Sequence, residues 1–126
     1  MLATMKLNEG RSGATQLIRR YGAQGVTIGT LEHPLPVLIC PSTVVTGFDA
    51  NQLADLSAAD LQRIFACKPA IVLAGSASGQ WFPPAAVRHA FEGQRIALES
   101  MEFGAACRTF NVLVQEDREV VALLFP

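Results

Sequence analysis

The chain has 126 residues, of which 50% are hydrophobic and only 17% are charged. Ten basic and eleven acidic side chains give a net charge of −1, without the clustered excess of Lys and Arg that binding to nucleic acid or to an anionic membrane requires. A chain of this length forms one domain with a substantial core. The high hydrophobic fraction predicts strands buried on both faces, or an apolar surface that needs a partner.

The cysteines and the first residues indicate the compartment. Cys40, Cys67 and Cys107 are odd in number, with no C-x-x-C motif, which predicts reduced thiols in the cytoplasm rather than a disulfide framework. The start, MLATMKLNEGRSG, lacks the apolar segment of a signal peptide, and no apolar run reaches the roughly 18 residues of a membrane span. We expect a cytoplasmic protein without membrane insertion, with a flexible tail over residues 1–14 and one domain over residues 15–126.

The first half of the chain predicts a β-meander with short turns. Apolar and polar residues alternate after residue 25, and the run LPVLICP is β-branched and bounded by prolines. In the first strand we expect Tyr21 to be buried, together with Leu17 or Ile18. The expected strands lie near residues 15–21, 26–28, 35–41 and 43–46, with turns at 22–25 and 31–34.

The second half predicts an alternation of strands and helices. Ser57 and Asp60 have the spacing of a capping box, and Lys68-Pro69 should end the helix that they begin. Further elements are expected as strands at 70–74, 95–99 and 120–125 and as helices at 83–93 and 105–115. Crossovers of this kind are right-handed and place helices against a mostly parallel sheet. The fold class is therefore α/β, and the meander either extends that sheet or packs over it as a second one.

Two strand-to-helix loops, 75–83 and 100–104, are expected to leave the sheet at the same edge. In open α/β folds that edge binds ligands, and the helix N-termini there expose N–H groups that favour an anion. Arg108 lies one turn into its helix and is placed to add a bidentate contact. The loops contain neither a dinucleotide fingerprint nor a phosphate-binding P-loop. A small-anion crevice is one interpretation of these residues.

The same polar residues have a purely structural alternative. Arg108 would then pair with Glu99 or Glu102. These glutamates are also candidate paired carboxylates for acid–base work, although solvation or pairing with arginine is the simpler interpretation. The residues that would only cap helices are Ser76, Ser78 and Gly104.

Cys107 is the candidate nucleophile or redox-sensing thiol. If Gly104 caps the helix, Cys107 is its third residue, where the helix and Arg108 would lower the thiol pKa. The alanine neighbours instead favour a small residue buried between helix and sheet, and no histidine base is evident within reach. Asn111 is a poor helix former, and its amide is expected to bond a neighbouring loop in a structural or a binding role.

Trp81 and Phe82 lie beside the expected crevice, either as an apolar rim that anchors a partner or as a cover over the core. No catalytic residue, metal site or cofactor is predicted, because no set of His, Cys and Asp residues has ligand spacing. The candidate binding crevice comprises Gly75, Ser76, Ser78, Gly79, Gln80, Trp81, Phe82, Gly104, Cys107, Arg108 and Asn111.

The segment GAACRTFNVL, residues 104–113, resembles the G-A-A-C-R-T-Y-N-V-L signature of the Mth938-like domain family, also called the DUF498 family. Residues 71–84 resemble that family's apolar strand, glycine loop and Gln-x-Phe-x-Pro segment, and weaker matches extend over most of the chain. Two positions depart from the pattern. Phe110 replaces the usual tyrosine and removes a hydroxyl, and Ala77 replaces a frequent glycine, so a tight phosphate-binding turn is not expected.

The resemblance implies a single three-layer α/β domain with a mixed central sheet, flanking helices and an N-terminal β-meander. Relatives include a mitochondrial assembly factor for respiratory complex I and an adipogenesis-associated protein, and no enzymatic activity is established for the family. We therefore expect a non-enzymatic protein-interaction or assembly factor, linked to respiratory complex assembly by this resemblance. The alternatives are a protein or enzyme, such as a hydrolase or transferase, that binds a small anionic ligand in the crevice, and a redox sensor at Cys107.

Overall fold

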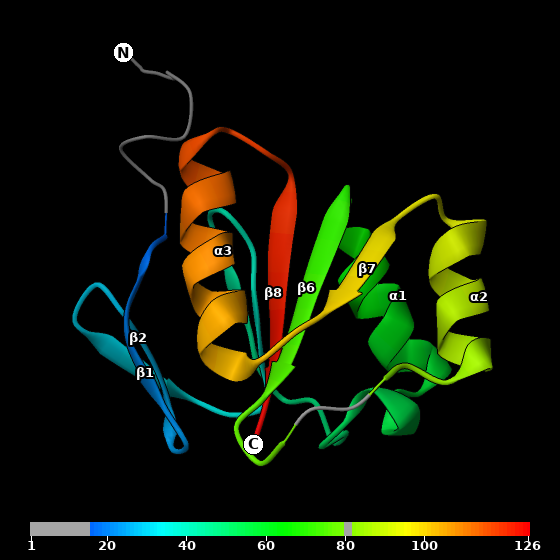
Figure 1. The fold of residues 1–126 in the computed structure, drawn as a ribbon, viewed down its shortest axis with the longest axis horizontal. Helices are drawn as coiled ribbons and strands as arrows, with labels where there is room; N and C mark the ends of the chain where they lie inside the picture. The colour runs from blue at the N-terminus through cyan, green and yellow to red at the C-terminus, as the bar shows by residue number, and fades with distance from the viewer. Residues whose placement is uncertain (1–15, 80–81) are drawn as a thin grey trace.

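The computed structural model describes residues 16–79 and 82–126 (Figure 1). The expected tail over residues 1–14 and the candidate site residues Gln80 and Trp81 lie outside this part of the chain. Within it, the chain forms a five-stranded sheet, a three-stranded sheet and the helices that cover them.

A mixed sheet with the strand order β5-β4-β8-β6-β7 forms the centre of the molecule. Its middle strand β8 (Val120–Phe125) is parallel to β6 (Ile71–Ser76) and antiparallel to β4 (Val37–Ile39). At the edges, β5 (Val44–Val45) pairs with β4 and β7 (Ala97–Ser100) pairs with β6. Every residue of β8 is buried, which confirms the expectation of a strand covered on both faces.

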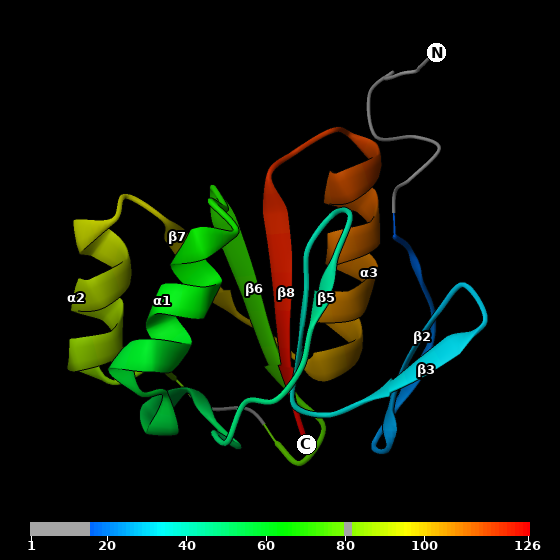
Figure 2. The same ribbon diagram turned by 180° about the vertical axis from the view of Figure 1, so that it is seen from behind.

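Helices cover both faces of this sheet. The helices α1 (Ala58–Ala66) and α2 (Ala85–Gly93) lie on one face and α3 (Phe103–Gln115) lies on the other (Figures 1 and 2). A short 3-10 helix, η1 (Leu53–Asp55), precedes α1. Alternate residues of β8 serve the two cores. Val120, Ala122 and Leu124 pack with α3, whereas Val121, Leu123 and Phe125 pack on the side of α1 and α2.

The meander is a separate antiparallel sheet of β1 (Ile18–Gly22), β2 (Gly25–Ile28) and β3 (Leu31–Pro34). It lies beside α3 in both views (Figures 1 and 2). Its buried hydrophobic residues are Ile18, Val26 and Ile28, which join the core that α3 forms with the central sheet. The choice that the sequence left open is therefore settled in favour of a second sheet.

The expected turn at residues 31–34 is wrong, because these residues form β3. The chain instead turns two residues earlier at Gly29-Thr30, where Gly29 has the left-handed φ of +62°. A two-residue connection containing glycine between apolar segments is a hairpin signal, and it was present in the sequence. The strand over residues 35–41 is shorter than expected, and a cis peptide bond joins Leu35 to Pro36 ahead of β4.

The boundaries of α1 follow local sequence chemistry. The Ser57 hydroxyl accepts a hydrogen bond from the Asp60 N–H at 3.0 Å, and the Asp60 carboxylate accepts one from the Ser57 N–H at 3.1 Å. This confirms the predicted capping box. The helix ends at Ala66, before Lys68-Pro69 as expected. The next helix, α2, begins after Pro84, which is its N-cap rather than part of its first turn.

Candidate functional site

Glu102, and not Gly104 as expected, caps the N-terminus of α3. Its two carboxylate oxygens accept hydrogen bonds from the backbone N–H groups of Gly104 and Ala105, each at 2.9 Å. The bond from Gly104, followed by that from Ala105, lowers the pKa of the Glu102 carboxyl, because both bonds favour its charged form. Two N–H groups that were expected to attract an external anion are therefore bonded within the chain.

Arg108 is tied to two residues of the same region. Its Nη1 donates a hydrogen bond to the Tyr21 hydroxyl oxygen at 2.6 Å, and its Nη2 lies 3.8 Å from Oε1 of Glu102. The ion pair matches the structural alternative for Arg108. Both charged side chains are more than 60% exposed, so the pair itself adds little stability, and its main effect is to position the two groups.

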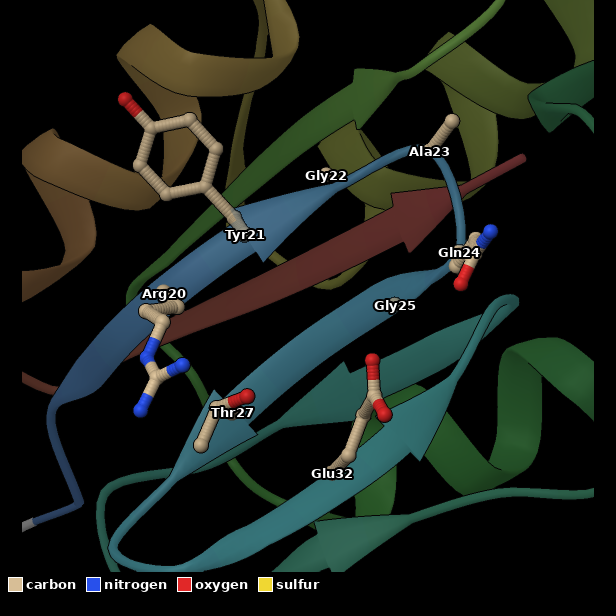
Figure 3. A pocket seen from close by; sticks show the side chains of 8 residues that line it. All are labelled: Arg20, Tyr21, Gly22, Ala23, Gln24, Gly25, Thr27 and Glu32. Atoms are coloured by element: carbon tan, nitrogen blue, oxygen red, sulfur yellow. The ribbon is translucent and has the colours of Figure 1, made fainter.

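An irregularity in β1 brings Tyr21 to this position. The pairing of β1 with β2 shifts register between Ile18 and Arg20, and such a bulge redirects the side chains that follow it. Ile18 and Tyr21, three residues apart, therefore both face α3, whereas Arg20 points away (Figure 3). The Tyr21 ring meets the Phe103 ring edge-on, with centroids 5.9 Å apart. The expectation that Tyr21 is buried is wrong, since it is 42% exposed.

Two glycines allow close approaches at the site. A Cβ at Gly104 would lie 2.9 Å from Nη1 of Arg108 and 3.0 Å from the Tyr21 hydroxyl oxygen, so Gly104 makes room for these side chains. A Cβ at Gly75 would lie 3.1 Å from the Cα of Phe103. Gly75 therefore lets the end of β6 pack directly against the first turn of α3.

Ser76 and Ser78 cap no helix, which corrects the structural alternative proposed for them. Their hydroxyl groups donate hydrogen bonds to the carbonyl oxygen of Pro126 at 2.9 and 3.0 Å, and the two hydroxyl oxygens lie 3.1 Å apart. These side chains hold the residue that follows β8. Both hydroxyl groups are thus engaged within the chain rather than directed at a ligand.

Cys107 is buried, with 1% of its surface exposed. It is the fifth residue of α3 because the helix begins at Phe103. Burial, reinforced by the negative charge of Glu102, raises the pKa of the Cys107 thiol to about 12. The favoured interpretation of Cys107, a small residue buried between helix and sheet, is therefore confirmed. The alternative of an activated, low-pKa thiol depended on a cap at Gly104 and on access to solvent, and neither is present.

Asn111 has a structural role. Its side-chain oxygen accepts a hydrogen bond from the Ile18 N–H at 2.8 Å, and its side-chain nitrogen donates one to the Ile18 carbonyl at 2.9 Å. The amide was expected to bond a neighbouring loop, and it bonds strand β1 instead. Asn111 therefore fastens the meander to α3.

A crevice of about 450 Å³ opens where the β1–β2 turn, the loop after β6 and the start of α3 meet. Of the predicted crevice residues, its lining includes Ser76 and Gly79, whereas Cys107 is buried in the core. Phe82 is 82% exposed and lies three residues beyond Gly79 along the chain. The lining residues that sequence reasoning did not assign are Tyr21, Gly22, Ala23, Ala77, Glu102 and Phe103.

A second pocket of about 440 Å³ adjoins the crevice on the meander and shares the segment 21–23 with it (Figure 3). Arg20, Thr27 and Glu32 line it from paired positions across the three strands. This pocket is therefore a polar surface of the meander, distinct from the largely apolar crevice.

Between residues 16 and 79 and from 82 onward, no group of three or more His, Cys, Asp or Glu side chains is arranged to hold a metal ion. In that same part, no helix combines the length and the hydropathy needed to cross a membrane.

Comparison with known proteins gives a family and a fold. The profile of a family described as "Protein of unknown function (DUF498/DUF598)" matches residues 18–125. The chain is 27% identical over 124 residues to the "13 kDa major membrane protein" of Francisella tularensis, covering 95% of this chain and 98% of that protein.

Two solved structures share the fold. An outer membrane protein from Bartonella henselae superposes with a TM-score of 0.76 at 31% identity, over 89% of this chain and 95% of that one. A Bordetella pertussis protein described as a Mth938-like domain superposes with a TM-score of 0.74 at 21% identity, over 97% of this chain and 92% of that one. The second likeness concerns the fold alone.

Proposed function

This chain belongs to the DUF498/DUF598 family of Mth938-like proteins of unknown function, and we propose that it is a non-enzymatic protein-interaction factor. Its crevice receives an apolar side chain from a partner protein. The partner is a membrane-bound protein under assembly, and the family resemblance suggests a component of a respiratory complex.

The internal bonding of the polar groups at the crevice carries this proposal. The Glu102 carboxylate bonds the start of α3 and the Ser76 hydroxyl bonds Pro126. The remaining side chains of the lining are those of Tyr21, Ala23, Ala77 and Phe103. A concave site with this composition favours an apolar or aromatic anchor over a charged metabolite.

Two further observations support binding rather than catalysis. The Cys107 thiol is buried and has a raised pKa, so it is a poor nucleophile at neutral pH. Phe82, three residues beyond Gly79 along the chain, exposes 82% of its surface, and exposed aromatic side chains are typical of protein contacts. A small anion would have to displace the Glu102 carboxylate from the start of α3.

The names of two relatives favour a partner in a membrane. One is named a major membrane protein and the other an outer membrane protein. A net charge of −1 gives this chain no electrostatic attraction to anionic lipid. In the proposal, the chain acts from the cytoplasm and reaches the membrane through its protein partner.

Site-specific photo-crosslinking in cells tests the proposal. A photoreactive amino acid at Ala23, which is exposed and lines the crevice, should give a discrete crosslinked product in the membrane fraction. The same probe at Val112, which is 54% exposed on α3 and outside the crevice lining, is the matched control and should not.

A charged substitution gives an independent readout of the same contact. Ala23→Arg should remove co-purification of the crosslinked partner, whereas Val112→Arg should preserve it, because only the first places a charge in the crevice. Thermal melts establish that both variants are folded. Equal crosslinking from positions 23 and 112, or none from position 23 in a folded protein, would contradict the proposal.

A further inference from the structure

Cys40 and Cys67 form a pair of thiols on the face of the central sheet that carries α1 and α2. Cys40 directly follows β4, and Cys67 is the C-cap of α1. Both belong to or pack against the core on that face. Their Sγ atoms lie 2.8 Å apart, although the residues are 27 positions apart in the sequence. The two sulfur atoms are therefore in direct contact, and a disulfide would bring them to roughly 2.05 Å.

We propose that Cys40 and Cys67 are an oxidisable dithiol, which closes to an intramolecular disulfide with a small-molecule disulfide as the oxidant. The Cys67 thiolate attacks one sulfur of the oxidant, forms a mixed disulfide and releases one small thiol. The Cys40 sulfur, after losing its proton to solvent, then attacks Cys67 Sγ and releases the second small thiol. The two protein thiols lose two electrons and two protons, and the oxidant gains them.

The surroundings of the two thiols assign these roles. Cys67 is partly exposed, whereas Cys40 is 5% exposed, so the oxidant reaches Cys67 first. Cys40 donates a hydrogen bond to Cys67 Sγ, so its sulfur is within reach of the sulfur that it would attack. Burial, followed by the bond to Cys67, raises the pKa of Cys40 to about 12. Closure is therefore slow at neutral pH and accelerates as the pH rises, because the thiolate is the attacking form.

The crosslink would close the segment between residues 40 and 67, which contains β5, η1 and α1. Within that segment, Arg63 of α1 already holds the stretch around Gly47 and Phe48. Its guanidinium lies 4.4 Å from the centre of the Phe48 ring and donates a hydrogen bond to the Gly47 carbonyl. A disulfide stabilises chiefly by restricting the unfolded chain. The pair lies across the sheet from α3, so its oxidation does not depend on the proposed function of the crevice.

The test uses the purified chain of 126 residues, incubated with oxidised glutathione at pH 8.5. Thiol titration in denaturant should fall from three free thiols to one, since the chain has three cysteines. Mass spectrometry should show the loss of two hydrogens and a peptide linking positions 40 and 67. The melting temperature should rise by on the order of 10 °C and return on addition of dithiothreitol.

Three variants separate the steps. Cys40→Ala should stop at a mixed disulfide with glutathione on Cys67, because the resolving thiol is missing. Cys67→Ala should leave position 40 unmodified, and Cys107→Ala should close as the parent does. Circular dichroism establishes whether each variant is folded. If a variant does not fold, the oxidation of the parent protein alone decides whether the disulfide forms. Three free thiols in the treated parent, a stable glutathione adduct on it, or a link that includes Cys107 would overturn the proposal.

Discussion

At the scale of single residues, the site depends on side chains that complete backbone hydrogen bonding. Asn111 pairs with both backbone groups of Ile18 as a neighbouring strand would, and Glu102 supplies acceptors for two N–H groups at the start of α3. Polar groups of this kind resemble ligand-binding residues in a sequence. Their partners in the folded chain identify them as structural.

Asn111→Ala should lower the free energy of unfolding by about 1–3 kcal/mol, because two partly buried hydrogen bonds are lost. Denaturant titration measures the change. Val112→Ala, at the adjacent and 54% exposed position, is the control and should change the stability little. Hydrogen exchange adds a local readout, since the Ile18 amide should exchange faster in the Asn111 variant. An Ile18 amide as protected as in the parent would refute the role assigned to Asn111.

Glu102 makes a pH-dependent contribution to stability. Its folded-state pKa is lowered from the ordinary value of 4.5, so the stabilisation is present above that value and is lost as the pH falls through the folded pKa. Glu102→Gln should therefore lower the melting temperature at pH 7, and the difference from the parent should shrink below pH 4.5. Glu99→Gln is a matched exposed control outside the crevice lining. A difference that is constant across this pH range would refute the capping role.

At the scale of elements, the close approach of β6 to α3 determines the shape of the crevice. β6 ends at Gly75-Ser76, and the absence of a side chain at Gly75 lets the first turn of α3 reach the strand. The bulge in β1 then places Tyr21 against the same turn. The crevice lies where these three elements meet.

Gly75→Ala should lower the free energy of unfolding by about 1–3 kcal/mol, because the new Cβ overpacks a buried contact. It would lie 3.1 Å from the Cα of Phe103 and 3.2 Å from the Cβ of Ala106. Gly93→Ala is the matched control. A Cβ there meets nothing within 4 Å, and alanine is the better helix former, so that change should be neutral or stabilising. Equal stabilities of the two variants would contradict the close packing of β6 and α3.

At the scale of the whole molecule, α3 is shared by two sheets. One side of the helix packs on the central sheet, and the buried residues of the meander join the same core. The crevice is consequently built from segments near residues 21–23, 76–79 and 102–103. The comparison of crosslinking from positions 23 and 112 tests this arrangement. The crevice forms only where the meander, the loop after β6 and the start of α3 meet.

Local sequence patterns predicted the elements well where local chemistry determines them. The capping box of Ser57 and Asp60 located the start of α1, and the apolar run at 120–125 coincides with β8. The cap of α3 was misplaced, because glycine is a common N-cap residue and glutamate is not, whereas in the fold the Glu102 carboxylate accepts the bonds from the first N–H groups. The β3 strand was missed because its exposed residues lack apolar alternation.

The sequence by itself determined the α/β class, most element boundaries and the family, since these follow from periodicity, capping and a local signature. The tertiary structure alone decided which polar residues are free to act. Glu102, Ser76 and Asn111 find backbone partners within the fold, and Cys107 is removed from solvent. Only the tertiary structure brings Cys40 and Cys67 together. The physical reason is that hydrogen-bond satisfaction, burial and pKa depend on neighbours that are distant in the chain.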